Sequence, residues 1–407
     1  MYMTKLSSIA DYVTDKISSN DIALREYVTT DCILQNKKGR EIATNLPPQS
    51  CCLTRYQHGD VLIANIRPYL KKVWFADIDG GASSDVLVFR AKEGHSPSFL
   101  YAVLLQDSFF DYVMQGAKGS KMPRGDKEQI LRYEMPTLSC SEESIGTFFL
   151  NLDQKIRLNE QINQNLEAMA KQLYDYWFVQ FDFPDENGRP YKSSGGEMVW
   201  NEKLKRKIPA SWENKNIEDI ADVYNGATPS TINEQNYGGD IVWITPKDLS
   251  DQKQKFVYQG ERNISQAGYN SCSTHLLPPN TILMSSRAPI GLLSIAKTEL
   301  CTNQGFKSFV PKAENISTYL YYYLNIHIKQ IEQLGTGTTF KEVSREDVLK
   351  FPILKPSDAI LDLWEERVSA LNNKQFEIQK ENEYLTKQRD ELLPLLMNGQ
   401  VLSLIHI

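Results

Sequence analysis

The sequence predicts an α+β fold in which two similar heads of mixed helix and strand are separated by two long antiparallel coiled-coil helices. Three observations support this: a heptad pattern from about residue 144, a second from about residue 358, and a similar order of strand-like runs before each. The pattern favours an internal duplication with pseudo-twofold symmetry. The expected segments are a first head (1–143), a first long helix (144–181), a linker (182–212), a second head (213–357), a second long helix (358–397) and a C-terminal tail (398–407).

The first head begins with a short helical run, residues 5–17. Runs rich in β-branched and aromatic residues, bounded by turn residues, then predict strands. These runs are 60–66, 72–76 and 85–90. An apolar stretch is read as one amphipathic helix at 97–114. A Gly-rich basic loop at 115–126 and a closing strand at 131–138 complete the head.

The first long helix has an apolar seam with alternating spacings of three and four residues. Its seam residues include Leu152, Ile156, Asn159, Asn163, Leu166, Leu173 and Trp177. At 1.5 Å per residue the helix would be a rod of roughly 50 Å. Asn159 and Asn163 fall on the seam, where polar residues cost stability but fix the register and the partner.

The second head repeats the order of the first. A helical start at 216–224 precedes strands at 240–245, 281–285, 292–297 and 308–310, a Tyr-rich helix at 318–334, a Gly/Thr loop at 335–341 and a closing strand at 348–354. Arg67 matches Arg287 and Phe89 matches Phe309 at a nearly constant offset. The repeating unit is therefore a whole head with its own long helix, rather than a short solenoid repeat.

The second long helix carries the matching seam. Its apolar and polar seam residues include Leu371, Gln375, Ile378, Asn382, Leu385, Arg389 and Leu392. Gln375, Asn382 and Arg389 are expected opposite Asn159 and Asn163, as register devices. Pro394 cannot donate a backbone hydrogen bond, so we expect this helix to end or kink just before it.

Composition bounds the class of protein. The chain of 407 residues is 41% hydrophobic and 24% charged, which is typical of two or three globular domains. No apolar run reaches the roughly 18 residues of a membrane span, and no signal-peptide core opens the chain. The six cysteines show no C-x-x-C spacing, which favours reduced thiols in a cytoplasmic protein and no metal site.

Charge and motifs favour binding over catalysis. The net charge of −6 argues mildly against a bulk nucleic-acid binder, but phosphate affinity depends on local Lys/Arg patches. The nucleophile elbow, the phosphate-binding P-loop and the dinucleotide fingerprint are all missing, and the five histidines are scattered. We therefore expect a non-catalytic chain with no cofactor of its own.

Loops that combine Gly, Ser or Thr and a cation let backbone amides and hydroxyls approach phosphate closely. The DNA-binding candidates of this kind are Arg67, Lys71, Lys118, Lys121 and Arg124 in the first head, and Ser285, Ser286, Arg287, Lys307, Thr338, Thr339 and Lys341 in the second. The alternative is that Arg67 and Arg287 only brace a turn before proline, and that the Gly/Thr loop is a flexible connection.

Together these stretches resemble the specificity subunits of type I restriction–modification systems. The first long helix (152–184) resembles their central conserved region, and residues 388–401 resemble their distal one. In the second head, TPS (228–230), YGGDIVWITPKDL (237–249), SSRAPIG (285–291), NQGFK (303–307) and GTTF (337–340) resemble the family's target-recognition domain. In the first head, NIRPYLKKVWFAD (65–77) and KMPRGD (121–126) resemble another subgroup of that domain.

The resemblance implies a non-catalytic DNA-reading subunit with a target-recognition domain in each head, binding a split target on double-stranded DNA. Because the heads differ in motif, the two half-sites should differ. The long helices would dock two methyltransferase subunits, which bring S-adenosylmethionine and flip an adenine out of each half-site. Motor–nuclease restriction subunits using ATP and Mg²⁺ would join them. The competing hypothesis is a coiled-coil adaptor that spaces two protein-binding heads. The apolar tail, 402–407, is not expected from the family pattern.

Overall fold

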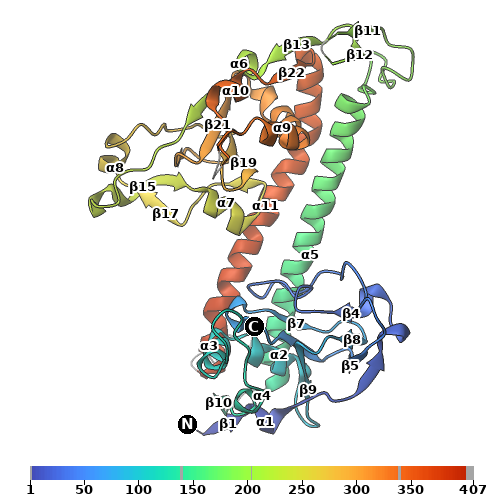
Figure 1. Cartoon of the computed structure of the whole chain (residues 1–407), viewed down its shortest axis with the longest axis vertical. Helices are drawn as coiled ribbons and strands as arrows, with labels where there is room; N and C mark the ends of the chain where they lie inside the picture. The colour runs from blue at the N-terminus through green and yellow to red at the C-terminus, as the bar shows by residue number, and fades with distance from the viewer. Residues whose placement is uncertain (1, 138–140, 203, 338–340, 400–407) are drawn as a thin grey trace. The chain divides into compact units, whose positions relative to one another are not determined.

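The computed structural model describes residues 2–137, 141–202, 204–337 and 341–399 (Figure 1). The chain divides into two compact units. Unit 1 comprises Met1–Ile162 with Lys380–Ile407, and unit 2 comprises Asn163–Gln379. The long helices α5 (Glu142–Tyr174) and α11 (Asp358–Met397) therefore each contribute residues to both units.

Unit 1 is built on two four-stranded sheets. The first has the order β2-β9-β6-β7 and is antiparallel throughout; its strands are Ala10–Tyr12, Val86–Ala91, Val61–Ala64 and Val73–Phe75. The second has the order β3-β5-β8-β4, with strands Lys16–Ser18, Cys52–Tyr56, Gly80–Ala82 and Tyr27–Val28. A separate pair joins the two ends of the head, β1 (Met3–Lys5) with β10 (Glu134–Pro136).

The helical starts expected for both heads are largely strand. In unit 1, α1 is one turn, Leu6–Ile9, and the chain continues directly into β2. In unit 2, α6 is also one turn, Ile217–Ile220, before β14 (Ala221–Asn225). Each turn buries both of its apolar ends, and the sheet then captures the following residues. Sheet pairing over long sequence distance thus overrides a local helical pattern.

The single amphipathic helix expected at 97–114 is two helices. α2 (Pro97–Leu105) and α3 (Asp107–Gln115) are separated by Gln106, whose backbone is extended. Residues 98–105 are all buried, so α2 is apolar on every side and lies inside the core. The one-turn helix α4 (Lys127–Ile130) follows the Gly-rich loop.

Unit 2 contains a five-stranded sheet of order β14-β21-β18-β19-β16. After β14 its strands are Phe306–Pro311, Ile282–Ser286, Ile290–Ala296 and Phe256–Val257. A three-stranded sheet has the order β17-β15-β20, with strands Arg262–Ile264, Tyr237–Ile244 and Cys301–Thr302. The remaining elements are the pair β13/β22 (Glu213–Asn216, Pro352–Lys355) and helices α7 (Pro246–Gln252), α8 (Gln266–Asn270), α9 (Ser317–Gln333) and α10 (Arg345–Leu349).

The units share a topology. The order β2-β9-β6-β7 of unit 1 corresponds strand for strand to β14-β21-β18-β19 of unit 2. Each head begins with a strand and a one-turn helix, its last strand pairs with that first strand, and a long helix follows. This repetition supports the internal duplication that the sequence predicts.

Polar seam contacts join the two long helices within unit 1. The side-chain amide of Asn159 donates to Oδ1 of Asn382 at 2.9 Å, and Asn382 donates to the carbonyl oxygen of Ile156 at 3.2 Å. Arg389 lies 3.3 Å from Asp153. Residue numbers rise along α5 while they fall along α11, so the helices are antiparallel here.

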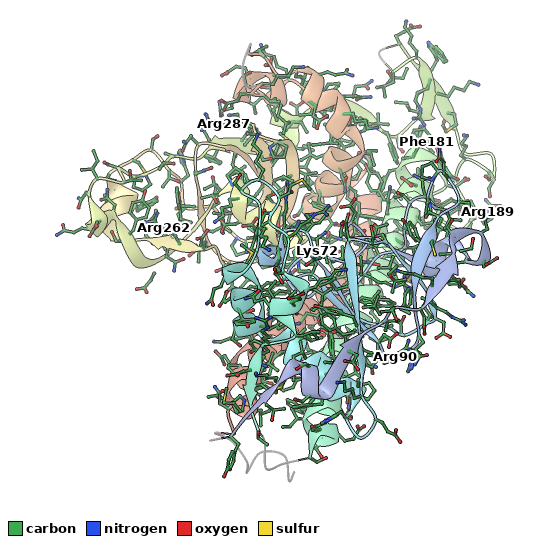
Figure 2. All side chains as sticks on the ribbon, turned by 60° about the horizontal axis from the view of Figure 1, so that its bottom comes forward. Lys72, Arg90, Phe181, Arg189, Arg262 and Arg287 are labelled. Atoms are coloured by element: carbon green, nitrogen blue, oxygen red, sulfur yellow. The ribbon has the colours of Figure 1, made fainter. Side chains whose placement is uncertain are left out.

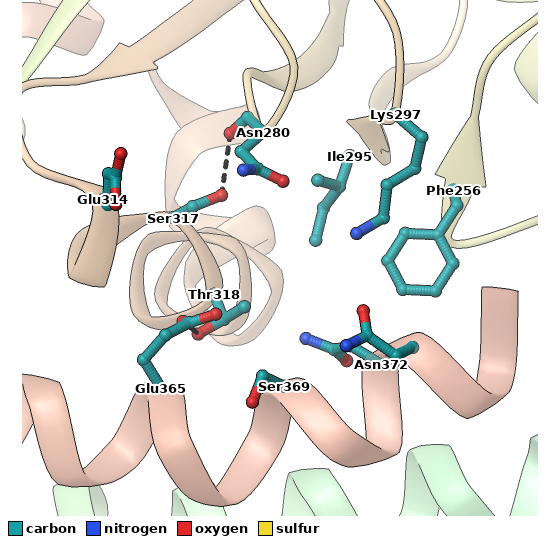
Figure 3. A pocket seen from close by; sticks show the side chains of 11 residues that line it. Phe256, Asn280, Ile295, Lys297, Glu314, Ser317, Thr318, Glu365, Ser369 and Asn372 are labelled. Carbon is teal, nitrogen blue, oxygen red and sulfur yellow. Dashed lines mark hydrogen bonds between the residues drawn. The ribbon is translucent and has the colours of Figure 1, made fainter.

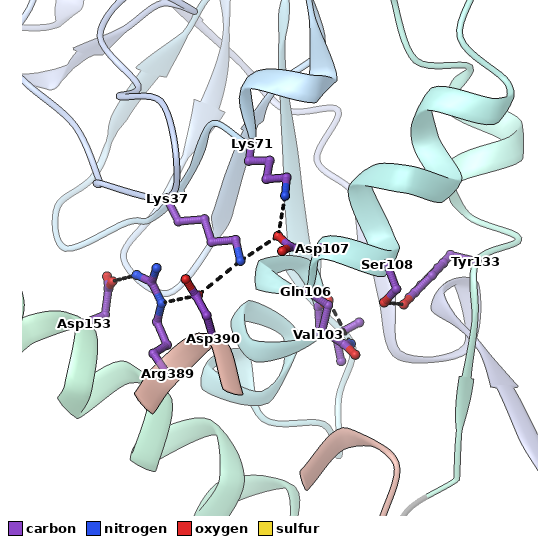
Figure 4. Close-up of polar contacts among 10 residues, drawn as sticks. All are labelled: Lys37, Lys71, Val103, Gln106, Asp107, Ser108, Tyr133, Asp153, Arg389 and Asp390. Atoms are coloured by element: carbon purple, nitrogen blue, oxygen red, sulfur yellow. Dashed lines mark hydrogen bonds and ion pairs between the residues drawn. The ribbon is translucent and has the colours of Figure 1, made fainter. Parts of the chain in front are cut away.

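A partly buried ion network anchors the first head to α11 (Figure 4). Lys37, 5% exposed, lies 2.8 Å from Asp107 and 3.4 Å from Asp390. Lys71 shares Asp107 at 2.9 Å, and Arg389 shares Asp390 at 3.0 Å. The loops that carry Lys37 and Lys71 are therefore held to α3 and α11 by ion pairs.

The helices are also antiparallel within unit 2. Asn163 and Gln375 exchange side-chain-to-backbone hydrogen bonds at 3.3 and 3.2 Å. Further along, Trp364 packs against Tyr174 and Trp177, with ring centroids 5.6 and 6.1 Å apart. A five-residue π-helical stretch, Asp175–Val179, ends the first helix.

The segment expected as a linker, residues 182–202 and 204–212, belongs to unit 2 and is anchored to the core of that unit at its two ends. Phe181 and Phe183 lie 5.2 and 5.3 Å from the ring of Trp212. The segment also contains a hairpin, β11 (Met198–Asn201) with β12 (Arg206–Pro209). Aromatic residues at both ends of the segment thus tie it to the core.

The helix α11 does not end before Pro394; it runs on to Met397, which is the end expected for the second long helix. Proline removes its own N–H donor and its ring crowds the carbonyl four residues earlier, so the last turn depends on packing. Leu393, Leu396 and Met397 are at most 4% exposed and belong to the core of unit 1. Burial of these side chains offsets the lost hydrogen bond. Within the described part of the chain, the structure contains no helix that is both long and apolar enough to cross a membrane.

Candidate nucleic-acid interface

In unit 1 the turn after β6 is tied to the Gly-rich loop. Arg67 is exposed, adopts φ +53°, and its backbone N–H donates to the carbonyl oxygen of Pro123 at 2.8 Å. Lys118 and Arg124 exchange both backbone hydrogen bonds, each 2.9 Å, and Arg124 also bridges Ile66. The loop is therefore a small hairpin that brings Arg67, Lys118 and Arg124 together.

The cations of this loop are exposed and weakly held. Lys118, whose side chain is 83% exposed, lies 3.1 Å from Asp126, and Arg124 lies 3.2 Å from Asp85. Lys121 is exposed at the tip of the loop. Ion pairs in this setting contribute little to stability, so a phosphate can replace the carboxylate at small cost. Lys71, by contrast, is half-buried against Asp107 and supports the fold.

Unit 2 has the same backbone arrangement with different side chains. Thr336 and Glu342 exchange both backbone hydrogen bonds, at 3.0 and 2.9 Å, as Lys118 and Arg124 do in unit 1. Glu342 therefore occupies the position of Arg124. Its carboxylate lies 3.7 Å from Arg287 and 3.3 Å from Lys307.

Some of the sequence-predicted candidates are buried, which corrects their assignment. Ser285 and Ser286 are 0% exposed and Lys307 is 5% exposed. The hydroxyl of Ser285 donates to the carbonyl oxygen of Pro289 at 2.7 Å and shapes the turn. Ser286 and Lys307 contact Glu342, so these side chains brace the turn that presents Arg287. Lys341 is exposed, while Thr338 and Thr339 lie outside the described residues.

Two further loops of unit 2 are joined by a polar contact between residues that were not among the predicted DNA-binding candidates. The hydroxyl of Thr228 donates to the side-chain oxygen of Gln304, and both residues are exposed. The N–H of Ser286 donates to the carbonyl oxygen of Gly305 at 2.7 Å, which connects this pair to the Arg287 turn. Thr228 lies in the TPS motif and Gln304 in the NQGFK motif. Both motifs carry the family resemblance, but neither residue was among the predicted DNA-binding candidates.

Arg262 is a second missed residue. It lies on β17, with its guanidinium 4.4 Å from the ring centroid of Tyr237. The hydroxyl of Tyr237 donates to the carbonyl oxygen of Pro229 at 2.8 Å, beside Thr228. Figure 2 shows Arg262 and Arg287 on unit 2. Only tertiary contact reveals the stack, because nothing in the local sequence around Arg262 marks it.

The seam residues lie where a helix pair requires them. Four of them are buried: Ile156, Asn159, Trp177 and Ile378. The others are half-buried: Leu152, Asn163, Leu166, Leu173, Leu371, Asn382, Leu385 and Leu392.

A small polar cavity lies in unit 2 beside α9 and α11 (Figure 3). Its volume is about 40 Å³, and Thr318, Glu365 and Lys297 are among its lining residues. This size admits water and excludes an organic cofactor. Burial lowers the pKa of Lys297 and raises the pKa of Glu365. Among the described residues, no group of three or more His, Cys, Asp or Glu side chains is placed to hold a metal ion.

Comparison with known proteins finds similarity to type I restriction enzyme specificity subunits. Residues 209–384 match the model of the type I restriction modification DNA specificity domain. The chain is 42% identical over 153 residues to the MjaIX specificity subunit of Methanocaldococcus jannaschii, an alignment covering 37% of this chain and 35% of that relative. It is 27% identical to the HindI specificity subunit of Haemophilus influenzae, across 97% of this chain and 98% of that one.

A solved structure shares the fold. The crystal structure of a type I restriction-modification S subunit from M. genitalium superposes with a TM-score of 0.61 at 13% identity. The superposition covers 96% of this chain and 94% of that one. Residues 209–384 of this chain therefore carry the type I restriction modification DNA specificity domain, and the chain as a whole is similar to type I restriction enzyme specificity subunits.

Proposed function

We propose that this chain is the DNA sequence-recognition subunit of a type I restriction–modification complex and binds an asymmetric, bipartite target. Each unit would contact one half of the target through its turn-and-loop surface. One observation carries the proposal. The same backbone-tied pair of loops occurs in both units, but it presents different side chains in each.

The chemistry of the two surfaces differs in a way that suits different half-sites. Unit 1 presents Arg67, Lys118, Lys121 and Arg124 on one hairpin and its neighbouring turn. Such a cluster fits the DNA backbone, where cations position a protein without reading sequence. In unit 2, Glu342 partly neutralises Arg287. The exposed side chains of Thr228 and Gln304 lie nearby, and their hydroxyl and amide groups can hydrogen-bond base edges.

The proposed partners supply the chemistry. Two methyltransferase subunits, carrying S-adenosylmethionine, would dock on this chain and modify an adenine in each half-site. Restriction subunits using ATP and Mg²⁺ would join the same assembly. This chain would contribute recognition and positioning and would take no catalytic step itself.

The direct test is to co-express the full chain with its methyltransferase subunits and to map methylated adenines across the genome. The expected result is one split motif whose halves differ. A palindromic motif, or methylation without a split motif, would contradict the proposal.

A binding measurement separates this function from that of a protein-binding adaptor. Association of the methyltransferase complex with a duplex carrying the motif should weaken steeply between about 50 and 200 mM salt, because bound phosphates release counterions. Duplex binding that does not respond to salt would favour the adaptor.

A further inference from the structure

Unit 2 holds an exposed arginine whose donors are unused. No hydrogen bond or ion pair of the Arg262 side chain occurs within the part of the chain that the structure describes, although the residue is exposed. Its guanidinium instead stacks on the ring of Tyr237, 4.4 Å from the ring centroid. A guanidinium on an aromatic face is attracted by the ring quadrupole and keeps its planar fork of N–H donors free.

The platform beneath Arg262 is fixed from two sides. The hydroxyl of Tyr237 donates to Pro229 at 2.8 Å, and the indole N–H of Trp243 donates to Ala227 at 3.1 Å. The rings of Tyr237 and Trp243 meet edge to face, with centroids 6.0 Å apart. Trp243 is also the cross-strand partner of Arg262. The arginine therefore stands on a preorganised surface, which lowers the entropy lost when it binds.

The same platform connects Arg262 to the polar loops described above. Pro229 and Ala227 flank Thr228, whose hydroxyl contacts Gln304. The strands that carry the stack, β15 and β17, form an antiparallel ribbon with β17 at the edge of its sheet. The major groove of B-DNA admits a two-stranded ribbon, so the β17 edge of this three-stranded sheet can approach base edges there.

We propose that Arg262 is a specificity-determining residue for the half-site bound by unit 2. Its guanidinium would donate hydrogen bonds to the O6 and N7 atoms of one guanine. Tyr237 is the positioning residue that holds the guanidinium in plane. The proposal rests on the proposed function, because it needs unit 2 to bind DNA. Guanine is the base whose major-groove edge offers paired acceptors to an arginine fork.

The test compares methylation motifs of the full complex carrying wild-type chain, Arg262→Lys, Arg262→Gln or Tyr237→Leu. Lysine keeps the charge but loses the fork. We expect Arg262→Lys to relax one guanine of the motif, lowering discrimination on the order of 10- to 100-fold, while the other half stays unchanged. Tyr237→Leu should lower discrimination at the same guanine. Arg262→Gln should lower it too, and should also weaken binding to every sequence because the positive charge is lost.

Arg206 supplies the matched control. It too stacks on an aromatic ring, 4.4 Å from the centroid of Phe181, and donates to the carbonyl oxygen of Val179 at 2.8 Å. Arg206→Gln should leave the motif unchanged. Binding to a duplex with 7-deazaguanine at the identified position gives a second readout. Loss of the N7 acceptor should weaken the wild-type complex and leave Arg262→Lys unaffected.

The outcomes separate the two hypotheses. A wild-type motif that persists in both Arg262 variants would overturn the assignment and leave the proposed function intact. Uniformly weaker binding to every sequence, with an unchanged motif, would make Arg262 a phosphate contact and also overturn it. A wild-type complex without any split motif would overturn the proposed function and this assignment together.

Discussion

The ammonium nitrogen of Lys255 lies 2.8 Å from Oε2 of Glu167, with 9% of the lysine side chain exposed. The same nitrogen donates to the hydroxyl of Tyr322 at 2.6 Å and to Oδ1 of Asn372 at 2.8 Å. Burial lowers the pKa of Lys255, and the charge of Glu167 opposes that effect. One side chain beside β16 thereby joins the second head to both α5 and α11 within unit 2.

Lys255→Met should destabilise unit 2 strongly, because it leaves a carboxylate and several acceptors without their shared donor. Removing one partner of a buried ion pair costs about 3–5 kcal/mol. Urea unfolding followed by tryptophan fluorescence suits the measurement, since Trp177, Trp212 and Trp364 lie in the core of unit 2. Lys374→Met is the control: its side chain is 61% exposed beside Glu377, and a change within about 0.5 kcal/mol is expected. Equal effects of the two variants would contradict a structural role for Lys255.

His327 should make unit 2 sensitive to acid. Its Nδ1 lies 2.8 Å from the carbonyl oxygen of Tyr323, and burial lowers the pKa of this imidazole below the ordinary 6.5. As pH falls below 6.5, the unfolded chain binds a proton that the folded chain does not, so stability decreases until the folded pKa is passed. Above pH 6.5 the group contributes no pH dependence.

His327→Phe keeps an aromatic ring stacked on Tyr323 and removes the titration. We expect the variant to lose less stability than the wild type between pH 7.5 and pH 5, measured as the urea midpoint at each pH. Parallel pH curves for the two proteins would refute this explanation.

Asn159 and Asn382 should be energetically coupled. Replacing either by Ala leaves the other's amide short of a partner in a half-buried seam, at a cost of about 1–3 kcal/mol. The double variant should cost less than the sum of the two single variants, because the interaction is lost only once. The measurement is a double-mutant cycle from urea unfolding. Additive effects would show that the hydrogen bond at 2.9 Å does not couple the helices.

Salt dependence distinguishes the exposed candidates from the buried ones. Lys121→Ala or Arg124→Ala should each reduce the slope of log binding constant against log salt by about 1, as expected for one phosphate contact. Ser285→Ala should leave that slope unchanged and instead lower the unfolding midpoint, because the hydroxyl of Ser285 hydrogen-bonds to Pro289, in the turn after β18, and to Leu292, on β19. A smaller slope for Ser285→Ala would restore it as a DNA contact.

The sequence alone determined the two long helices and the repeated heads. Heptad spacing is a local, periodic signal, so Ile156, Asn159 and Ile378 could be placed on a seam before any contact was known. The offset between Arg67 and Arg287 likewise placed both on the turn that follows a matching strand, β6 or β18. Local periodicity failed at the helical starts and at Gln106, where sheet pairing and burial decided the conformation.

The tertiary structure decided which polar residues face solvent. Residue type made Ser285, Ser286 and Lys307 good phosphate candidates, but burial against Glu342 and the turn removed them. The tertiary structure also added Arg262, Thr228 and Gln304 as candidates, because their partners lie on other strands and loops. Whether a side chain is free to contact DNA depends on the neighbours that folding brings close to it. Sequence spacing therefore determined the scaffold, and packing between distant segments decided the candidate site.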